Sequence, residues 1–139
     1  MANRADAGRE ASKPGPTTAT GRGSGRKTFV LVHGGFHGGW CWSQVANLLR
    51  ARGHAVYTPT GCGERSHLLS RSITLDTFVD DIANVLQWED LHRVVLVGHS
   101  FGGIAITGVA DRMPERLRQL VYLDAGSVTR SRRSSCRHG

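Results

Sequence analysis

One serine in this sequence lies in a pattern that is typical of a catalytic nucleophile. Ser100 is the centre of Gly98-His99-Ser100-Phe101-Gly102, which follows the valine-rich run 94–97 and precedes a stretch of small and apolar residues. A serine at the tip of a tight strand-to-helix turn presents its hydroxyl to a cleft, and the flanking glycines leave room for that turn. The helix N-terminus stabilises negative charge that develops nearby. The pattern predicts Ser100 as the nucleophile of an acyl-transfer reaction.

A second glycine-rich motif predicts the groups that would stabilise the oxyanion. His33-Gly34-Gly35 directly follows the apolar run 29–32. Acyl transfer needs two backbone N–H donors at the developing oxyanion, one from the residue after the nucleophile and one from a loop of this kind. These donors would be the amides of Phe101 and Gly35. Glycine-rich loops also occur only to make tight turns, so it is the pairing with the serine motif that favours the functional interpretation.

The elements that must position these groups follow from the hydrophobic pattern. Short unbroken apolar runs are typical of strands buried on both faces of a parallel sheet. They occur at residues 29–32, 55–58, 94–97 and 120–123. Apolar residues recur at helical spacing over 42–49, 75–86 and 104–110. This alternation predicts an α/β fold: a parallel sheet with flanking helices and right-handed crossovers.

The predicted topology also indicates which edge of the sheet is functional. Ligands of such folds bind beyond the carboxyl ends of the strands. The two glycine-rich motifs, the loop 61–65 and Asp124 all follow predicted strands, so we expect them at this edge. Thr74 or Ser72 can cap the helix expected over 75–86.

These motifs resemble blocks of the α/β-hydrolase superfamily. The blocks are Phe29-Val-Leu-Val-His-Gly-Gly-Phe-His-Gly-Gly-Trp-Cys-Trp42, Thr60-Gly-Cys-Gly-Glu-Arg-Ser-His67 and Val97-Gly-His-Ser-Phe-Gly-Gly103. They look most like the plant methylesterase and hydroxynitrile lyase branch and its bacterial esterase-like relatives. The resemblance implies Ser100 as the nucleophile and the amides of Gly35 and Phe101 as the oxyanion hole. It implies a small ester as substrate, with no metal and no cofactor.

The resemblance also predicts how the chain is organised. In the family, a helical cap, two further strands, a catalytic acid and a catalytic histidine follow the block that ends at Ala125, whereas residues 126–139 have no apolar periodicity. We therefore expect a disordered basic tail over 1–27, the N-terminal half of an α/β-hydrolase domain over 28–125, and a second disordered basic tail over 126–139. The fold would be truncated, without its cap and last strands. The second tail would be either a frameshift or a genuine extension.

The absence of a clear general base in the sequence weakens the prediction of catalysis. A general base must come within about 3 Å of the serine hydroxyl. None of the seven histidines is expected to supply this base, although His67 is the least poorly placed, and Asp124 has no triad role without a histidine to orient. The prediction is a carboxylesterase-like serine hydrolase that is weak or inactive as this chain. The alternative is a non-catalytic remnant or small-molecule-binding module, and a cyanohydrin lyase ranks third.

The charge distribution argues against a nucleic-acid partner. Residues 1–27 hold six basic and two acidic residues, and residues 126–139 hold four basic residues. The segment between them contains eight arginines and nine acidic residues, so it is nearly neutral. The net charge of +7 therefore lies in the two tails. Neither tail interleaves aromatic with basic residues or offers a recognition helix.

Cysteine content and hydropathy indicate a cytoplasmic protein without a membrane anchor. Cys41, Cys62 and Cys136 are an odd number without a CxxC pair or matching histidine spacing, so neither a disulfide framework nor a zinc site is predicted. No apolar run approaches the roughly 18 residues of a membrane span. An incomplete sheet would expose apolar surface at 120–123, and we expect self-association through that edge.

Overall fold

The computed structural model describes residues 25–61 and 72–126 of the chain. The predicted basic tails at 1–27 and 126–139 lie almost entirely outside these residues. His67, the least poorly placed histidine, also lies outside them.

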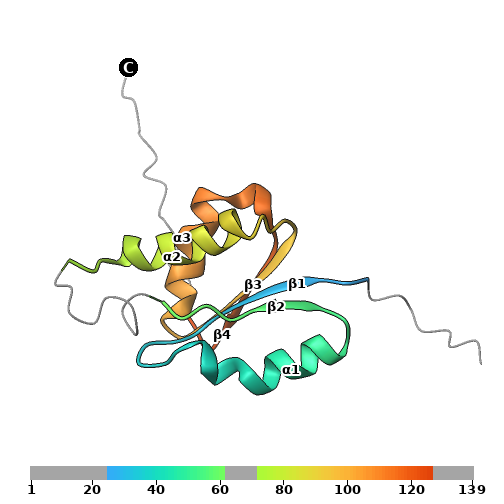
Figure 1. The fold of residues 1–139 in the computed structure, drawn as a ribbon. Coiled ribbons are helices and arrows are strands. Elements are labelled where there is room, and N and C mark those ends of the chain that lie inside the picture. Colours follow the sequence, from blue (N-terminus) through green and yellow to red (C-terminus); the bar gives the residue numbers. More distant parts are fainter. Residues whose placement is uncertain (1–24, 62–71, 127–139) are drawn as a thin grey trace, which may run out of the picture.

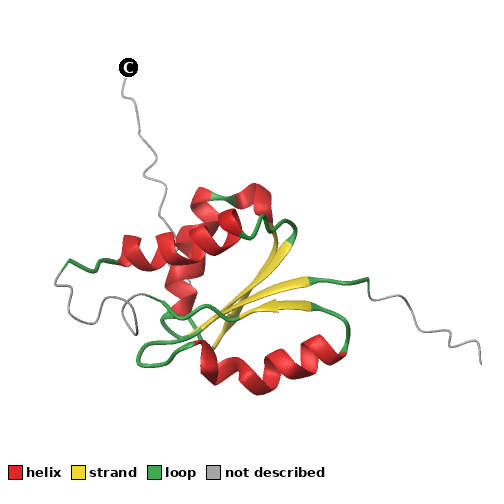
Figure 2. Ribbon diagram, in the orientation of Figure 1, coloured by secondary structure: helices red, strands yellow, loops and turns green. Residues whose placement is uncertain are grey.

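Strands and helices alternate along the described chain, as the hydrophobic pattern predicts (Figure 2). The strands are β1 (Thr28–Val32), β2 (Ala55–Tyr57), β3 (Val94–His99) and β4 (Leu117–Leu123). The helices are α1 (Ser43–Ala51), α2 (Leu75–Trp88) and α3 (Gly102–Arg112), with short 3-10 helices η1 (Gly39–Trp42) and η2 (Pro114–Arg116). The predicted parallel α/β fold is confirmed.

All strand pairs in the sheet are parallel, and the strand order is β2-β1-β3-β4. The chain passes from β1 outward to β2 and then returns to the other side of β1 to form β3. This reversal makes the carboxyl ends of β1 and β3 the topological switch point, where open α/β sheets bind their ligands. The glycine-rich loop directly follows β1, and the serine motif begins with the last two residues of β3.

The sheet has helices on both faces (Figure 1). On one face, α2 and α3 bury a large apolar cluster that includes Ile82, Leu86 and Ile106 against the strands. On the other face, α1 packs a smaller cluster around Leu31 and Trp42. The stripes of apolar residues at helical spacing are therefore the faces that meet the sheet.

Three hydrogen bonds fix the two ends of α2. At its start the Thr74 amide donates to Thr77 Oγ1 at 3.1 Å, so Thr74 and not Ser72 is the cap. At its end Arg116 Nη1 donates to the carbonyls of Leu86 and Leu91, both at 3.1 Å. A guanidinium at a helix C-terminus satisfies free carbonyls and complements the helix dipole.

Strand β4 begins three residues earlier than the apolar run 120–123 predicts. It starts at Leu117 and includes Arg118 and Gln119, both exposed. β4 is an edge strand, and an edge position tolerates polar side chains that a central parallel strand would exclude. The prediction from unbroken apolar runs therefore made this strand too short.

The α1 face of the sheet is incompletely covered beside β4. Leu120 and Tyr122 pack against the α2–α3 cluster, so the alternation of side chains directs Val121 and Leu123 to the α1 face. Leu123 is 49% exposed there. Within residues 25–61 and 72–126, no helix is both long and apolar enough to cross a membrane.

Candidate active site

Ser100 occupies the turn between β3 and α3 in a strained backbone conformation. Its φ angle is 50°, in the left-handed region that non-glycine residues seldom adopt. The turn is held on both sides, since the Ser100 amide donates to the Leu123 carbonyl at 3.2 Å and the Ser100 carbonyl accepts from Gly103 at 3.0 Å. Ser100 is exposed, as expected for a residue lifted above the strand ends.

The glycines around Ser100 are required by close backbone packing. A Cβ on Gly98 would lie 2.6 Å from the Gly102 carbonyl oxygen. A Cβ on Gly102 would lie 2.7 Å from the His33 carbonyl oxygen, where β1 ends. The serine motif therefore also brings the start of α3 against the loop that follows β1.

That loop is anchored by two histidine rings. His33 Nε2 accepts a hydrogen bond from the Gly61 amide at 3.1 Å, so the proton of the neutral ring must lie on Nδ1, which donates to the Gly34 carbonyl at 2.7 Å. His37 Nδ1 lies 2.8 Å from the Gly35 carbonyl oxygen. With their carbonyls engaged, Gly34 and Gly35 are fixed in one orientation at the end of β1.

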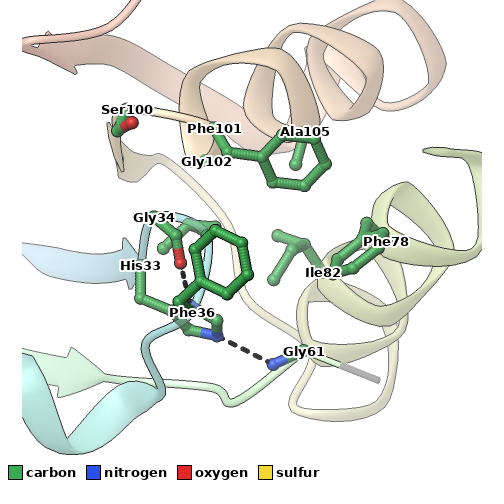
Figure 3. A pocket seen from close by; sticks show the side chains of 12 residues that line it. His33, Gly34, Phe36, Gly61, Phe78, Ile82, Ser100, Phe101, Gly102 and Ala105 are labelled. Atoms are coloured by element: carbon green, nitrogen blue, oxygen red, sulfur yellow. Dashed lines mark hydrogen bonds between the residues drawn. The ribbon is translucent and has the colours of Figure 1, made fainter. Parts of the chain in front are cut away.

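An apolar pocket is lined by both the loop and the serine. Its volume is about 410 Å³, and Gly35, Ser100 and Phe101 all line it. Figure 3 shows Ser100 at one end and the rings of Phe36 and Phe101 beside the open space. The structure thus brings the predicted nucleophile together with both residues predicted to donate to the oxyanion. Among the described residues, neither of these two amides is used in another hydrogen bond.

Gly35 has room for a side chain, unlike the glycines of the serine turn. A Cβ on Gly35 would meet no atom within 4 Å. Only the backbone N–H of this residue is needed for the predicted role, so a side chain there would cost nothing.

No side chain of the described residues hydrogen-bonds to the Ser100 hydroxyl. Both ring nitrogens of His33 are already engaged. The ring of His99 stands edge-on to Trp42, at a centroid distance of 6.4 Å and an interplanar angle of 90°. His54 and His92 lie at the amino ends of the strands, where His54 packs on Phe29 and His92 pairs with Asp90.

Cys41 is a poor alternative nucleophile. Burial raises the pKa of its thiol, which reduces the thiolate present at neutral pH. In the described part of the chain, no three His, Cys, Asp or Glu residues are placed to hold a metal ion.

Two pocket residues were missed by the sequence analysis. Phe78 on α2 reaches the pocket and meets Phe101 edge to face, with ring centroids 5.1 Å apart. Phe36 lines the same pocket from the loop after Gly35. Phe78 belongs to the apolar stripe of α2. The sequence around it does not indicate that this part of the stripe lines a pocket at the strand ends.

A parallel sheet whose switch point carries a strained serine turn beside a glycine-rich loop is the arrangement of the α/β-hydrolase class. The sequence pattern of the alpha/beta hydrolase family matches residues 29–137, and the chain belongs to this family.

Curated relatives of the chain include esterases. The chain is 54% identical over 99 residues to the carbendazim hydrolyzing esterase of Nocardioides sp. (strain SG-4G), covering 70% of this chain and 41% of that protein. It is 37% identical over 105 residues to methylesterase 1 of Arabidopsis thaliana, covering 72% and 40%. The chain therefore spans about two fifths of the length of these relatives.

A solved structure supports the same assignment. It is an extracellular alpha/beta-hydrolase from a Paenibacillus species, described as sharing structural and functional homology with tobacco salicylic acid binding protein 2. Its TM-score with this chain is 0.70 at 33% sequence identity, and the match covers 74% of this chain and 42% of that structure. The described sheet and helices thus correspond to part of an α/β-hydrolase fold.

Proposed function

We propose that this part of the fold serves carboxylic ester hydrolysis, with Ser100 as the nucleophile and the amides of Gly35 and Phe101 as the oxyanion hole. The observation that carries the proposal is the strained turn at Ser100, a residue that lines the same apolar pocket as Gly35 and Phe101. Strained backbone conformations persist where surrounding structure enforces them, and they concentrate at functional sites. The esterase relatives support the same reaction type.

The reaction would proceed through an acyl-enzyme. Ser100 Oγ attacks the ester carbonyl carbon while its proton passes to a base, and the carbonyl electron pair moves onto oxygen. The two amides donate to this oxyanion, and the N-terminus of α3 adds a favourable dipole. The tetrahedral intermediate collapses, the alcohol leaves with a proton from the same base, and water then hydrolyses the acyl-serine.

The chain by itself is proposed to be weak or inactive. Nothing in residues 25–61 and 72–126 is bonded to the Ser100 hydroxyl as a base. In serine hydrolases that lack a triad member, the oxyanion hole and substrate binding leave only residual catalysis, about ten-thousandfold or more below the intact enzyme.

The second candidate function is non-catalytic binding of small molecules. The pocket is formed and apolar, whereas the hydroxyl within it lacks an activating partner in the described structure. A protein with these features would bind a neutral carbonyl compound between Gly35 and Phe101 without cleaving it.

Ester turnover with and without a complementing polypeptide separates the two functions. The substrate is p-nitrophenyl acetate, and the complement is the part of the Nocardioides esterase that follows its matched region, supplied as a separate chain. We expect slight or no turnover alone and clear turnover after mixing, abolished by Ser100→Ala. Turnover that persists in Ser100→Ala would exclude Ser100 as the nucleophile. Ligand binding without turnover in any mixture would favour the binding function.

A small ester is the proposed ligand, with no nucleic-acid partner. The partly uncovered face beside β4 supports self-association as a further proposal, because Leu123 is exposed at the edge of the sheet. The cytoplasmic location stays a prediction from the cysteine content of the sequence.

A further inference from the structure

Phe36 combines two energetically unfavourable features at the pocket. Its φ angle is 61°, which is rare for a bulky residue. Its side chain is 96% exposed, the largest exposure among the large hydrophobic residues described. Strained backbone conformations concentrate at functional sites and exposed apolar side chains mark sites of interaction, so both features make Phe36 a candidate ligand contact.

The neighbouring hydrogen bonds hold Phe36 in place. The carbonyls of Gly34 and Gly35, the two residues before it, accept from the rings of His33 and His37 at 2.7 and 2.8 Å. The direction of the chain into Phe36 is thus fixed on the same loop that presents the Gly35 amide.

The ring of Phe36 faces an apolar and aromatic wall. Figure 3 shows it across from Ile82, with Phe101 and Phe78 around the same space. Phe78 and Phe101 meet at an interplanar angle of 78°. Among the described lining residues only His33 and Ser100 have polar side chains, and both ring nitrogens of His33 are engaged.

We propose that Phe36 is a specificity-determining residue that contacts a planar aromatic group on an uncharged carbonyl substrate. This inference rests on the proposed function for the position of the carbonyl, beside Ser100 and the Gly35 amide. A ligand ring in this space would bury the exposed Phe36 face and meet three phenyl rings, which prefer offset-stacked or edge-to-face partners. The absence of charged side chains among the described lining residues selects a neutral ligand.

Binding of an uncleavable ketone tests this inference apart from catalysis. The probe is para-fluorophenylacetone, followed by fluorine NMR, and cyclohexylacetone is the non-aromatic competitor. Phe36→Gly removes the ring and also relieves the positive φ angle, since glycine adopts this conformation freely. Trp88→Ala is the control, because Trp88 is also an exposed aromatic residue, 82% exposed, but does not line the pocket.

We expect the aromatic ketone to bind the native chain more tightly than the cyclohexyl ketone. Phe36→Gly should weaken its binding about tenfold while melting at an equal or higher temperature, and Trp88→Ala should bind as the native chain does. The inference is overturned if the native chain shows no binding or no preference for the aromatic ketone, or if Phe36→Gly binds within about twofold of native. Because the ketone is not cleaved, its binding should persist in Ser100→Ala even where ester turnover fails.

Discussion

His33 Nε2 accepts a hydrogen bond from the backbone amide of Gly61 at 3.1 Å, although 28 residues separate the two. The ring is only 6% exposed, and its other nitrogen donates to the Gly34 carbonyl. One imidazole therefore ties the loop after β1 to the loop after β2. The loop that carries the Gly35 amide depends on this connection for its position.

Replacing His33 with phenylalanine should destabilise the fold. The substitution keeps an aromatic ring but leaves the buried Gly61 amide without its acceptor, which costs about 1–3 kcal/mol. Urea unfolding measures the loss. His37→Ala is the comparison, because that ring is exposed and its removal should change the free energy of unfolding by about 0.5 kcal/mol or less. Equal stability of the two variants would contradict the role assigned to His33.

Two of the glycines that line the pocket should respond differently to alanine. Gly102→Ala places a Cβ 2.7 Å from the His33 carbonyl oxygen and 2.9 Å from that of Val32, and backbone atoms there cannot move aside cheaply. We expect a loss of about 1–3 kcal/mol by chemical denaturation. Gly35→Ala meets nothing within 4 Å and should leave stability nearly unchanged. A larger loss of stability for Gly35→Ala than for Gly102→Ala would contradict the close packing described for the serine turn.

The parts of the site that depend on local patterns could be predicted from the sequence. Ser100 and Phe101 follow from a strand-to-helix turn, and Gly35 follows from a glycine-rich loop at a strand end. The structure brings all three to one pocket because β1 and β3 are neighbours.

Other features depend on relationships that the local sequence does not encode. The His33–Gly61 hydrogen bond exists only because β2 lies directly beside β1, which places two distant loops together. The positive φ of Phe36 opposes its own steric preference and is imposed by the loop around it. The early start of β4 reflects its edge position, which the apolar run could not indicate.

Acidification should reduce the stabilising contribution of the Asp90 carboxylate near the end of α2. The hydrogen bond from His92 is the largest cause that holds the pKa of Asp90 below its ordinary value of 3.8, and the hydrogen bond from Arg116 is the second largest. A carboxyl whose pKa is lowered by folding stabilises the fold above its unfolded pKa, and this contribution is lost as the pH falls through the folded value.

Asp90→Asn tests this pH dependence with little change of shape. Asparagine tolerates the positive φ of 47° at this position. We expect the native chain to be slightly more stable than the variant at neutral pH, and the difference to shrink as the pH falls below 3.8 and to disappear once the pH is below the lower pKa of the folded state. Salt should also reduce it, because Asp90 is exposed. A difference that stays constant with pH would exclude the carboxylate as its source.

The edge of the sheet at β4 should promote self-association. Leu123 is 49% exposed on a strand that has no neighbour on its outer side in the described sheet. Leu123→Lys should shift the chain toward monomer in sedimentation velocity, because a charged side chain disfavours edge-to-edge pairing. Leu48→Lys, at an exposed position of α1, should not. A native chain that is already a monodisperse monomer would contradict this prediction.

Phosphonylation of Ser100 tests the central claim most directly. The folded chain is treated with a fluorophosphonate probe at increasing imidazole concentration, and the adduct is measured by intact mass and located by peptide mapping. Ser43→Ala serves as a control at an exposed serine of α1. We predict one slow modification, at Ser100, that imidazole accelerates by acting as an external base and that Ser100→Ala abolishes while Ser43→Ala does not. A folded chain in which Ser100 stays unmodified at every imidazole concentration would contradict its assignment as the nucleophile.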